Sequence, residues 1–439
     1  MSAFWLLLLW VTALWVMNGG VQELGTVSGA LTTLGRITGL IASALLLVQV
    51  FLMARVPWFE QAWGQDGLAR THRLVGFTSF NLLWAHIVLI TLGYAASTPL
   101  GLWGTIVDFV LNYPGMLLAV AGTVALCMVV VTSVKRARRR LRYESWHLIH
   151  LYGYLGAGLA LPHQLWTGQD FVGSRPATVT WWGLYAVCAA AVLGFRVTLP
   201  LVRSLRADLR VVAVRSEGPG MSSVVVGGPG VARLSARPGQ FFQWRFLDGP
   251  GWSRAHPYSL SAAPDGRNLR ITAAHVGDGT SRLATLRPGT RVLVEGPYGR
   301  LHDGVRSQSK VLLLGGGIGI TPLRSILEGL DSQTRDVVVV HRAHDAGQLV
   351  LSGELRDLAA RRGGRYVTVT GPRVPGRQTW LPATAAHLTD AQALVQLVPD
   401  VAERDVFVCG APGWMEAVRQ ATLDCGVPAD QLHLERFEY

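Results

Sequence analysis

Cysteine and charged residues are both scarce in this chain of 439 residues. The four cysteines, Cys127, Cys188, Cys409 and Cys425, show no CxxC or other paired spacing. The sequence therefore gives no support for a zinc site, an iron–sulfur centre or a disulfide framework. Charged residues make up 15% of the chain and apolar residues 50%, which is too apolar for a chain that is soluble throughout.

The apolar residues crowd into the first 205 positions, and ordinary soluble composition follows. Most of the apolar runs approach the ~20 residues that a helix needs to cross a bilayer. The first run has no basic segment before it and no A-x-A-like cleavage site, so we interpret it as a retained span. The runs are 4–17, 37–54, 73–96, 114–134, 145–163 and 179–201. We predict a six-helix, all-α transmembrane bundle over residues 1–205, with the lipid bilayer as its partner.

The net charge of +12 does not indicate nucleic-acid binding, because the basic residues gather beside the predicted spans. They flank the second and third spans, form the segment KRARRRLR at 135–142, and end the sixth span: Arg55, Arg70, Arg73, Arg196, Arg203, Arg206 and Arg210. With six spans, all of these lie on one side. The positive-inside rule makes that side the cytoplasm. We expect a multi-pass plasma-membrane protein with both termini in the cytoplasm and short outer loops.

Four histidines lie inside the third and fifth predicted spans, where ionisable groups are usually functional. His72 and His86 are fourteen residues apart, and His150 and His163 are thirteen apart. Both spans start from the cytoplasmic side, so the histidines form an inner and an outer level about 20 Å apart. Each level offers one imidazole from each helix, which suits two axial ligands of a haem iron. We predict two b-type haems.

The helical angles fit this prediction unevenly. Fourteen residues return to within ~40° of one helix face, whereas thirteen leave a mismatch of ~140°. Pro162 precedes His163 and provides a local break that re-aims the ring. His147 competes with His150 for the inner level, but lies about one turn too shallow. The alternative is that these histidines only hydrogen-bond to neighbouring helices.

The second half changes from short alternating strands to alternating strands and helices. The first pattern is typical of an antiparallel barrel and the second of a parallel sheet. The boundaries are 206–305 for a β-barrel flavin domain and 306–439 for an α/β nucleotide-binding domain. A glycine turn, Gly315, Gly316, Gly317 and Gly319, follows the first strand of the latter. Such a turn brings backbone N–H groups at a helix start, here Thr321-Pro322, close to a pyrophosphate, although many such turns only pack a helix on a strand.

Several segments together resemble the ferredoxin-reductase superfamily, in the form typical of bacterial NADPH oxidases and ferric reductases. RAHPYSLSAAP resembles its flavin-binding segment, VGDGTSRL the segment that binds the FAD pyrophosphate, and EGPYG the turn that closes the barrel. GGGIGITP and VFVCGAPGWM resemble its nicotinamide-domain signatures, and HLERF its terminal E-x-F. With the paired span histidines, the resemblance covers nearly the whole chain.

The resemblance assigns a role to each matching residue. Tyr258 would lie on the flavin, Ser259 would bond its N5 edge, and Thr280 would contact the pyrophosphate. His256 stands where soluble relatives have arginine, a loss for which Arg254 or Arg282 would compensate. Phe437 would cover the flavin until nicotinamide displaces it, with Tyr439 as a rival, and Cys409 would lie beside the nicotinamide. The remaining predicted cofactor contacts are Pro257, Val276, Gly277 and Gly410.

The second strand of the nucleotide domain ends in HRAHD, without an acidic residue at the position that favours NADH. Arg342, helped by Arg373, would hold a 2′-phosphate, so we favour NADPH over NADH; the alternative is that Arg342 is an exposed loop charge. The predicted function is electron transfer from cytoplasmic NAD(P)H through FAD and two haems to an outer acceptor. That acceptor is oxygen, chelated Fe(III) or a periplasmic redox protein. The alternative is a membrane-anchored flavin reductase without haems. No EF-hand loop is present, so we expect activity without an activator.

Overall fold

The protein, described here from a computed structural model, folds into two compact units, Met1–Thr198 and Leu199–Tyr439. The structure describes residues 2–138, 143–249, 251–252, 254–334 and 336–436. The boundary between the units precedes residue 205, where we predicted the end of the membrane domain. The helix Leu199–Ala207, directly after this boundary, belongs to the second unit.

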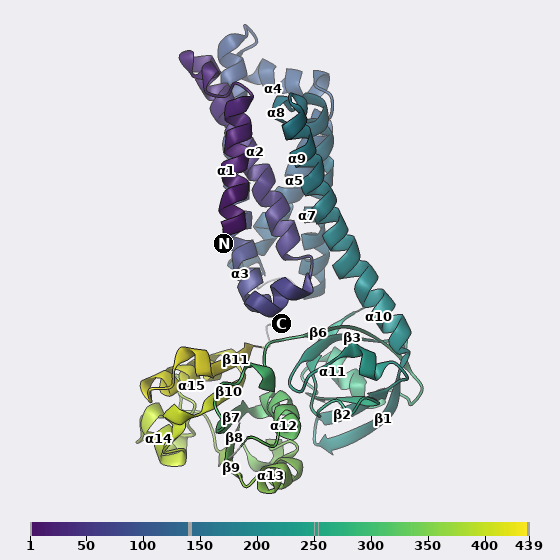
Figure 1. Cartoon of the computed structure of the whole chain (residues 1–439), viewed down its shortest axis with the longest axis vertical. Coiled ribbons are helices and arrows are strands. Elements are labelled where there is room, and N and C mark those ends of the chain that lie inside the picture. The colour runs from purple at the N-terminus through teal and green to yellow at the C-terminus, as the bar shows by residue number, and fades with distance from the viewer. Residues whose placement is uncertain (1, 139–142, 250, 253, 335, 437–439) are drawn as a thin grey trace. The chain divides into compact units, whose positions relative to one another are not determined.

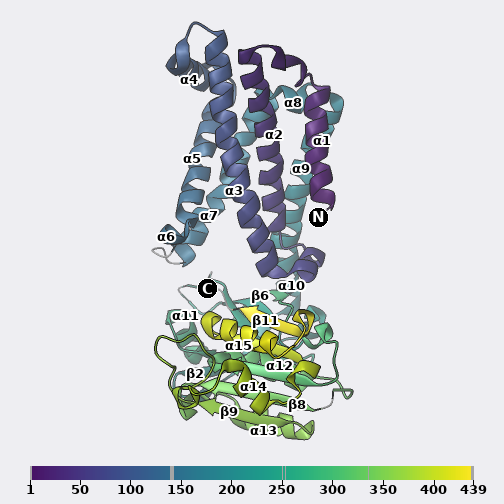
Figure 2. The same ribbon diagram turned by 90° about the vertical axis from the view of Figure 1, so that its left-hand side faces the viewer.

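The first unit is a bundle of apolar helices. Helices lie at all six apolar runs of the sequence and run alongside one another (Figures 1 and 2). They are α1 (Ser2–Met17), α2 (Val27–Leu52), α3 (Pro57–Ser97), α5 (Met116–Ser133), α7 (Tyr143–Thr167) and α9 (Arg175–Ala191), the last followed by a π-helical turn, Val192–Thr198. Shorter helices are α4 (Gly101–Asn112), α6 (Lys135–Arg138) and α8 (Gln169–Val172). Helix α4 fills a connection that we predicted to be only a short loop.

Four helical segments of the described chain are long and apolar enough to cross a membrane. They are Val27–Leu52, Gly67–Ser97, Met116–Ser133 and Arg175–Ala207. Helix α1 is apolar but shorter, and α7 is not in this group because its histidines and tyrosines lower its hydropathy. A helical bundle with apolar helices is therefore confirmed, whereas the count of six spans remains a prediction.

The helices pair closely through glycines, as membrane helices commonly do. Helix α2 packs along α3, and α5 packs along α7. A Cβ atom on Gly122 of α5 would lie 2.8 Å from the carbonyl oxygen of Gly156 on α7. A Cβ on Gly35 of α2 would lie 2.8 Å from the side chain of Ile90 on α3. Side chains of normal size at these positions would force the helices apart.

The second unit begins with α10 (Leu199–Ala207) and a six-stranded antiparallel sheet in the order β4-β3-β6-β1-β2-β5. The strands are β1 (Leu209–Gly218), β2 (Met221–Gly227), β3 (Phe241–Phe246), β4 (His256–Ser259), β5 (Asn268–Ala274) and β6 (Arg291–Tyr298). The Ser204 hydroxyl of α10 accepts a hydrogen bond from the Val294 N–H of β6 at 2.8 Å. This bond explains why α10 belongs to the second unit.

A parallel five-stranded sheet completes the second unit, in the order β11-β10-β7-β8-β9. Its strands are β7 (Val311–Gly316), β8 (Val337–Ala343), β9 (Arg365–Thr370), β10 (Asp405–Gly410) and β11 (Leu432–Arg436). Its main helices are α12 (Ile320–Gly329), α13 (Ser352–Arg361), α14 (Asp390–Leu397) and α15 (Pro412–Asp424). The central strands β7, β8 and β10 are buried almost throughout. Their apolar composition is the one expected of a parallel sheet covered on both faces.

Candidate functional site

The structure brings His72 of α3 and His150 of α7 together, as the inner level requires. Their ring centroids are 5.9 Å apart. The Nδ1 of His72 lies 3.0 Å from the carbonyl oxygen of Gln49 on α2. The Nδ1 of His150 lies 3.2 Å from the Ser133 hydroxyl at the end of α5. Each ring therefore contacts the neighbouring helix: His72 on α3 contacts α2, and His150 on α7 contacts α5.

The two outer histidines, His86 and His163, also make their hydrogen bonds through Nδ1. The Nδ1 of His86 lies 2.8 Å from the carbonyl oxygen of Gly35, and a Cβ on Gly39 would lie 2.5 Å from that same nitrogen. The Nδ1 of His163 lies 2.8 Å from the Thr167 hydroxyl, which also donates to the His163 carbonyl at 2.7 Å. A hydroxyl that donates there accepts from the ring, so Nδ1 of His163 carries its hydrogen.

In His72, His86 and His163 these bonds leave the Nε2 lone pair able to bind a metal, whereas the Ser133 hydroxyl can either donate to or accept from Nδ1 of His150. A carbonyl oxygen only accepts, so His72 and His86 must carry their hydrogens on Nδ1. Such a bond on the other ring nitrogen is the usual support of a metal-ligating histidine. The described residues contain no group of three or more His, Cys, Asp or Glu side chains suited to one metal ion. Paired histidines without a third protein ligand fit haem, whose porphyrin supplies the remaining ligands, better than zinc.

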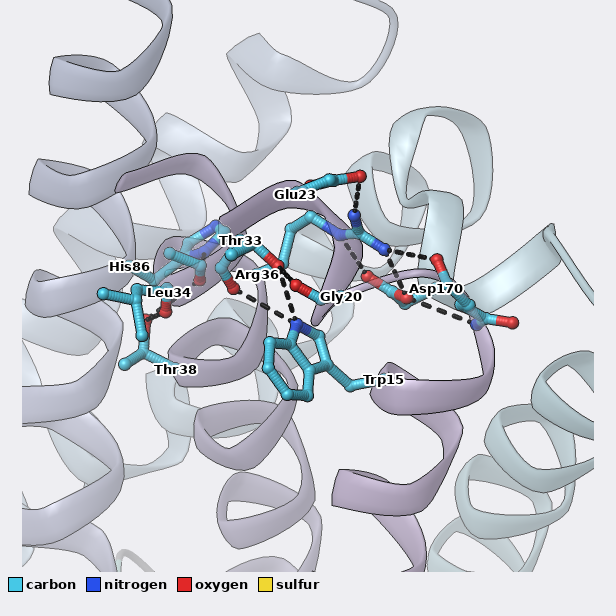
Figure 3. Close-up of polar contacts among 11 residues, drawn as sticks. Trp15, Gly20, Glu23, Thr33, Leu34, Arg36, Thr38, His86 and Asp170 are labelled. Atoms are coloured by element: carbon cyan, nitrogen blue, oxygen red, sulfur yellow. Dashed lines mark hydrogen bonds and ion pairs between the residues drawn. The ribbon is translucent and has the colours of Figure 1, made fainter. Parts of the chain in front are cut away.

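A buried ion cluster fixes α2 next to the outer histidine. The Arg36 guanidinium lies between the carboxylates of Asp170 and Glu23, at 2.8 and 2.5 Å (Figure 3). Asp170, on α8, also accepts a hydrogen bond from the Asn18 side chain at 3.2 Å. Asp170 is only 5% exposed. The Asp170 carboxylate is thus used within the bundle.

The flavin motif lies on β4, which pairs with β3. His256 approaches the neighbouring turn so closely that a Cβ on Gly279 would lie 2.6 Å from its ring. Pro257 pairs with Gln243 of β3. Ser259 is buried, and its hydroxyl has no hydrogen-bond partner among the described residues. A buried hydroxyl of this kind fits a cofactor that supplies the missing partner.

The predicted pyrophosphate segment forms a tight turn beside His256. The Thr280 hydroxyl accepts hydrogen bonds from the N–H groups of Val276 and Gly277 at 3.0 and 3.1 Å. Val276 is 81% exposed, so its side chain is open to a cofactor. Arg282, which we considered as a compensating phosphate ligand, instead forms an ion pair with Asp248.

Three glycines of the nucleotide turn have packing roles. A Cβ on Gly315 would lie 2.5 Å from the Ile320 side chain, one on Gly316 3.0 Å from the Trp414 ring, and one on Gly319 would collide with the Cys409 carbonyl. Gly317 differs, because a Cβ there would meet nothing within 4 Å and its φ is +56°. Packing therefore explains Gly315, Gly316 and Gly319, and only Gly317 faces open space.

Thr321 and Pro322 lie at the start of α12, and Gly410 ends β10. Helix α12 begins at Ile320, so Pro322 lies in its first turn. The buried Thr321 donates a hydrogen bond to the Ile318 carbonyl at 2.9 Å. Gly410 allows the Trp414 ring of α15 to approach, since a Cβ there would lie 2.7 Å from it. The indole N–H of Trp414 is buried without a hydrogen-bond partner among the described residues.

Cys409 and Arg342 are more enclosed than we expected. Cys409 is 0% exposed in the core beneath α12, and burial raises the pKa of its thiol well above the ordinary value. The place of Cys409 beside the nicotinamide stays a prediction. Arg342 is 6% exposed and donates to the carbonyls of Trp380 and Gly371 at 3.2 and 2.7 Å. Its donors are directed at the main chain and not at an exposed 2′-phosphate.

Arg373 is an exposed arginine in the loop that follows β9. Burial, and then the neighbouring charge of Arg373, lower the pKa of Arg342, which indicates that Arg373 lies nearby. Glu435, in the E-x-F segment, accepts a hydrogen bond from the Leu301 N–H at 3.1 Å. Strand β11 is thereby joined to the turn after EGPYG. Phe437 and Tyr439 lie outside the described residues.

Two families match separate parts of the chain. The ferric reductase like transmembrane component matches residues 38–161, and the oxidoreductase NAD-binding domain matches residues 313–420. The chain is therefore an oxidoreductase that combines a ferric reductase-like transmembrane region with a ferredoxin-reductase-type NAD-binding domain.

The relatives fall in the same class. The chain is 30% identical over 237 residues to an NADPH oxidoreductase of Mycobacterium tuberculosis, covering 52% of this chain and 59% of that one. It is 31% identical over 242 residues to the ferredoxin reductase component of a 3-ketosteroid-9-alpha-monooxygenase of Mycolicibacterium smegmatis, covering 53% and 65%. The chain thus spans less than two thirds of these relatives. A ferredoxin NADP+ reductase from Neisseria gonorrhoeae with bound FAD and NADP aligns with a TM-score of 0.43 at 22% identity, covering 52% and 97%.

Proposed function

We propose that the chain transfers electrons across a membrane from NAD(P)H, through FAD and two b-type haems, to an acceptor on the outer face. The observation that carries this proposal is the common hydrogen bonding of His72, His86, His150 and His163. Each ring is held through Nδ1, and in His72, His86 and His163 this bond leaves the Nε2 lone pair available for iron. FAD, when bound there, would supply the change from two-electron hydride transfer to one-electron transfer, and haem held by these histidines would supply one-electron acceptors.

The chain's own residues would hold these groups in order. Ser259 and the turn closed by Thr280 would bind the flavin, and Gly317 would admit the nucleotide phosphate. The bridge between Leu260 and Ile271 joins the two edges of the antiparallel sheet, and we infer that this sheet closes as a flavin-binding barrel. Arg373 replaces Arg342 as our proposed contact for a 2′-phosphate, and NADPH remains the favoured donor.

The proposed topology has six spans, α1, α2, α3, α5, α7 and α9, in the plasma membrane. The arginines beside these spans place both termini and the FAD and NAD(P) domains in the cytoplasm. The histidines on α3 and α7 then form two levels about 20 Å apart, which lets two haems cover most of the bilayer.

The first test is the difference spectrum of purified protein, reduced with dithionite minus oxidised. Two b-type haems per chain support the proposal. Bound flavin without a Soret band would favour the second candidate, a cytoplasmic flavin reductase anchored by a haem-free bundle. The hydrogen bonds of the four histidines are compatible with this candidate too, because they also satisfy rings that bind no metal.

The acceptor requires a separate experiment. Oxygen needs no dedicated pocket, whereas a metal chelate or a protein partner needs exposed polar groups. The pairing of Asp170 with Arg36 removes one such polar group, and we favour oxygen. Reduction of cytochrome c that superoxide dismutase abolishes would indicate superoxide. Reduction of ferric chelate that resists this enzyme would indicate a ferric reductase.

A further inference from the structure

A buried histidine near the nucleotide turn has no role in the proposed electron transfer. His341 lies near the end of β8, and its side chain is 0% exposed. It follows four consecutive valines of the strand. A polar ring in such a core must have hydrogen-bond partners, or its burial would destabilise the fold.

Both nitrogens of His341 have partners, which fixes the positions of the hydrogens. Nε2 lies 3.2 Å from the Gly317 carbonyl oxygen, and Nδ1 lies 2.9 Å from the Tyr366 hydroxyl on β9. The carbonyl only accepts, so Nε2 donates, and Nδ1 accepts from Tyr366. Burial lowers the pKa of His341 to about 4 and raises the pKa of Tyr366 to about 12. This arrangement therefore persists at neutral pH.

The Gly317 carbonyl accepts from two groups, the Ile320 N–H of its own turn and His341 Nε2, so His341 adds a second restraint on the direction of the adjoining peptide group. A trans peptide is planar, so its carbonyl and the N–H of the next residue point in opposite directions. The Gly317 carbonyl points toward the buried His341, and the Ile318 N–H therefore points away from it. Ligands of parallel sheets bind at the carboxyl ends of the strands, where this turn lies. A backbone N–H fixed in this way suits a phosphate oxygen.

We propose that His341, oriented by Tyr366, is a positioning residue for the pyrophosphate of NAD(P)H. It does not touch the nucleotide. It holds the Gly317 peptide so that the turn presents its N–H group to a phosphate. The inference rests on the NAD(P)H role of the parallel-sheet domain. Pyrophosphate binding would then depend on two side chains outside the glycine turn, one on β8 and one on β9.

The test uses the full-length protein with NADPH as donor and ferricyanide as acceptor. His341→Leu removes both hydrogen bonds at similar volume, His341→Gln keeps an amide donor, and Tyr366→Phe removes only the hydroxyl. We expect the KM for NADPH to rise about tenfold in His341→Leu and about threefold in Tyr366→Phe, with kcat within about twofold of wild type. The His341→Gln variant regains most of the wild-type KM.

Two competitive inhibitors separate positioning from general loss of structure. ADP-ribose carries the pyrophosphate and should bind about tenfold more weakly to His341→Leu. Adenosine 2′-monophosphate lacks the pyrophosphate and should bind as it does to the wild type. An unchanged KM, or equal weakening of both inhibitors, overturns the proposal. If His341→Leu fails to fold, the KM for NADPH and the binding of the two inhibitors are measured on Tyr366→Phe, and those results test the proposal. A wild-type protein that oxidises neither NADPH nor NADH would instead contradict the proposed function.

Discussion

The absence of a side chain at Gly39 leaves the space that the His86 ring occupies. A Cβ at this position of α2 would lie 2.5 Å from Nδ1 of His86. We expect Gly39→Ala to displace the ring and to lower the haem content from two towards one per chain, because the outer level loses one ligand. The pyridine haemochrome assay measures this content. Gly183→Ala on α9, where a Cβ meets nothing within 4 Å, is the matched control and should keep both haems.

His341 also predicts a pH dependence of stability. Its folded-state pKa is lowered to about 4, below the ordinary value of about 6.5. Between these values the unfolded chain binds more protons, so this contribution is complete above pH 6.5 and is lost as the pH falls toward 4. The expected loss is on the order of 3 kcal/mol.

Thermal unfolding of the full-length protein between pH 7 and 4.5 measures this loss. Burial also lowers the pKa of His302, so the relevant quantity is the difference between the wild type and His341→Leu. The variant should lose less stability over this range. Parallel curves for the two proteins would contradict the assignment.

Between elements, one carboxylate joins the antiparallel sheet to the helices of the parallel-sheet domain. Glu354 of α13 forms two hydrogen bonds with Arg270 of β5, both at 2.9 Å, and an ion pair with Arg324 of α12 at 2.7 Å. Burial alone would raise the pKa of Glu354, but Arg270 and then Arg324 lower it overall.

We therefore expect Glu354→Gln to destabilise the second unit by about 1 kcal/mol, a value reduced for the solvent exposure of this carboxylate. Urea-induced unfolding followed by flavin fluorescence measures the change. Glu403→Gln, which removes an exposed partner of Lys310, is the control and should change stability little. Equal effects of both variants would show that Glu354 is an ordinary surface charge.

For the whole molecule, the proposed haem relay predicts that one variant can lose reduction of an outer acceptor and keep reduction of an acceptor on the NADPH side. We expect His86→Ala to abolish NADPH-driven reduction of an acceptor on the outer face of proteoliposomes, since the outer haem loses its ligand. Reduction of ferricyanide on the NADPH side should remain within about twofold of wild type, because the flavin is unaffected. A variant that retains both activities would exclude the histidine relay.

At this same scale, the sequence predicted the order of domains well and several contacts poorly. Periodic apolar runs and short strands identified the helical bundle and both sheets, because burial patterns repeat along the chain. The partners Gln49, Ser133 and Thr167 were missed, since hydrogen bonds between helices leave no such pattern. The spacing of Gly35 and Gly39 by four residues, typical of close helix contacts, was an available signal. The roles of Arg342 and Asp170 depend on which groups enclose them, which a linear sequence does not record.

The glycine turn has a consequence for saturation mutagenesis. Substitutions at Gly315, Gly316 and Gly319 collide with the interior, so these variants should disappear from a library through low cellular abundance. A Cβ at Gly317 meets nothing within 4 Å, although the positive φ makes substitutions there mildly strained. They should accumulate in the cell while failing a selection for nucleotide use. Within this one turn, substitutions at three positions would lower the amount of protein in the cell. Substitutions at Gly317 would instead lower only growth that depends on nucleotide use.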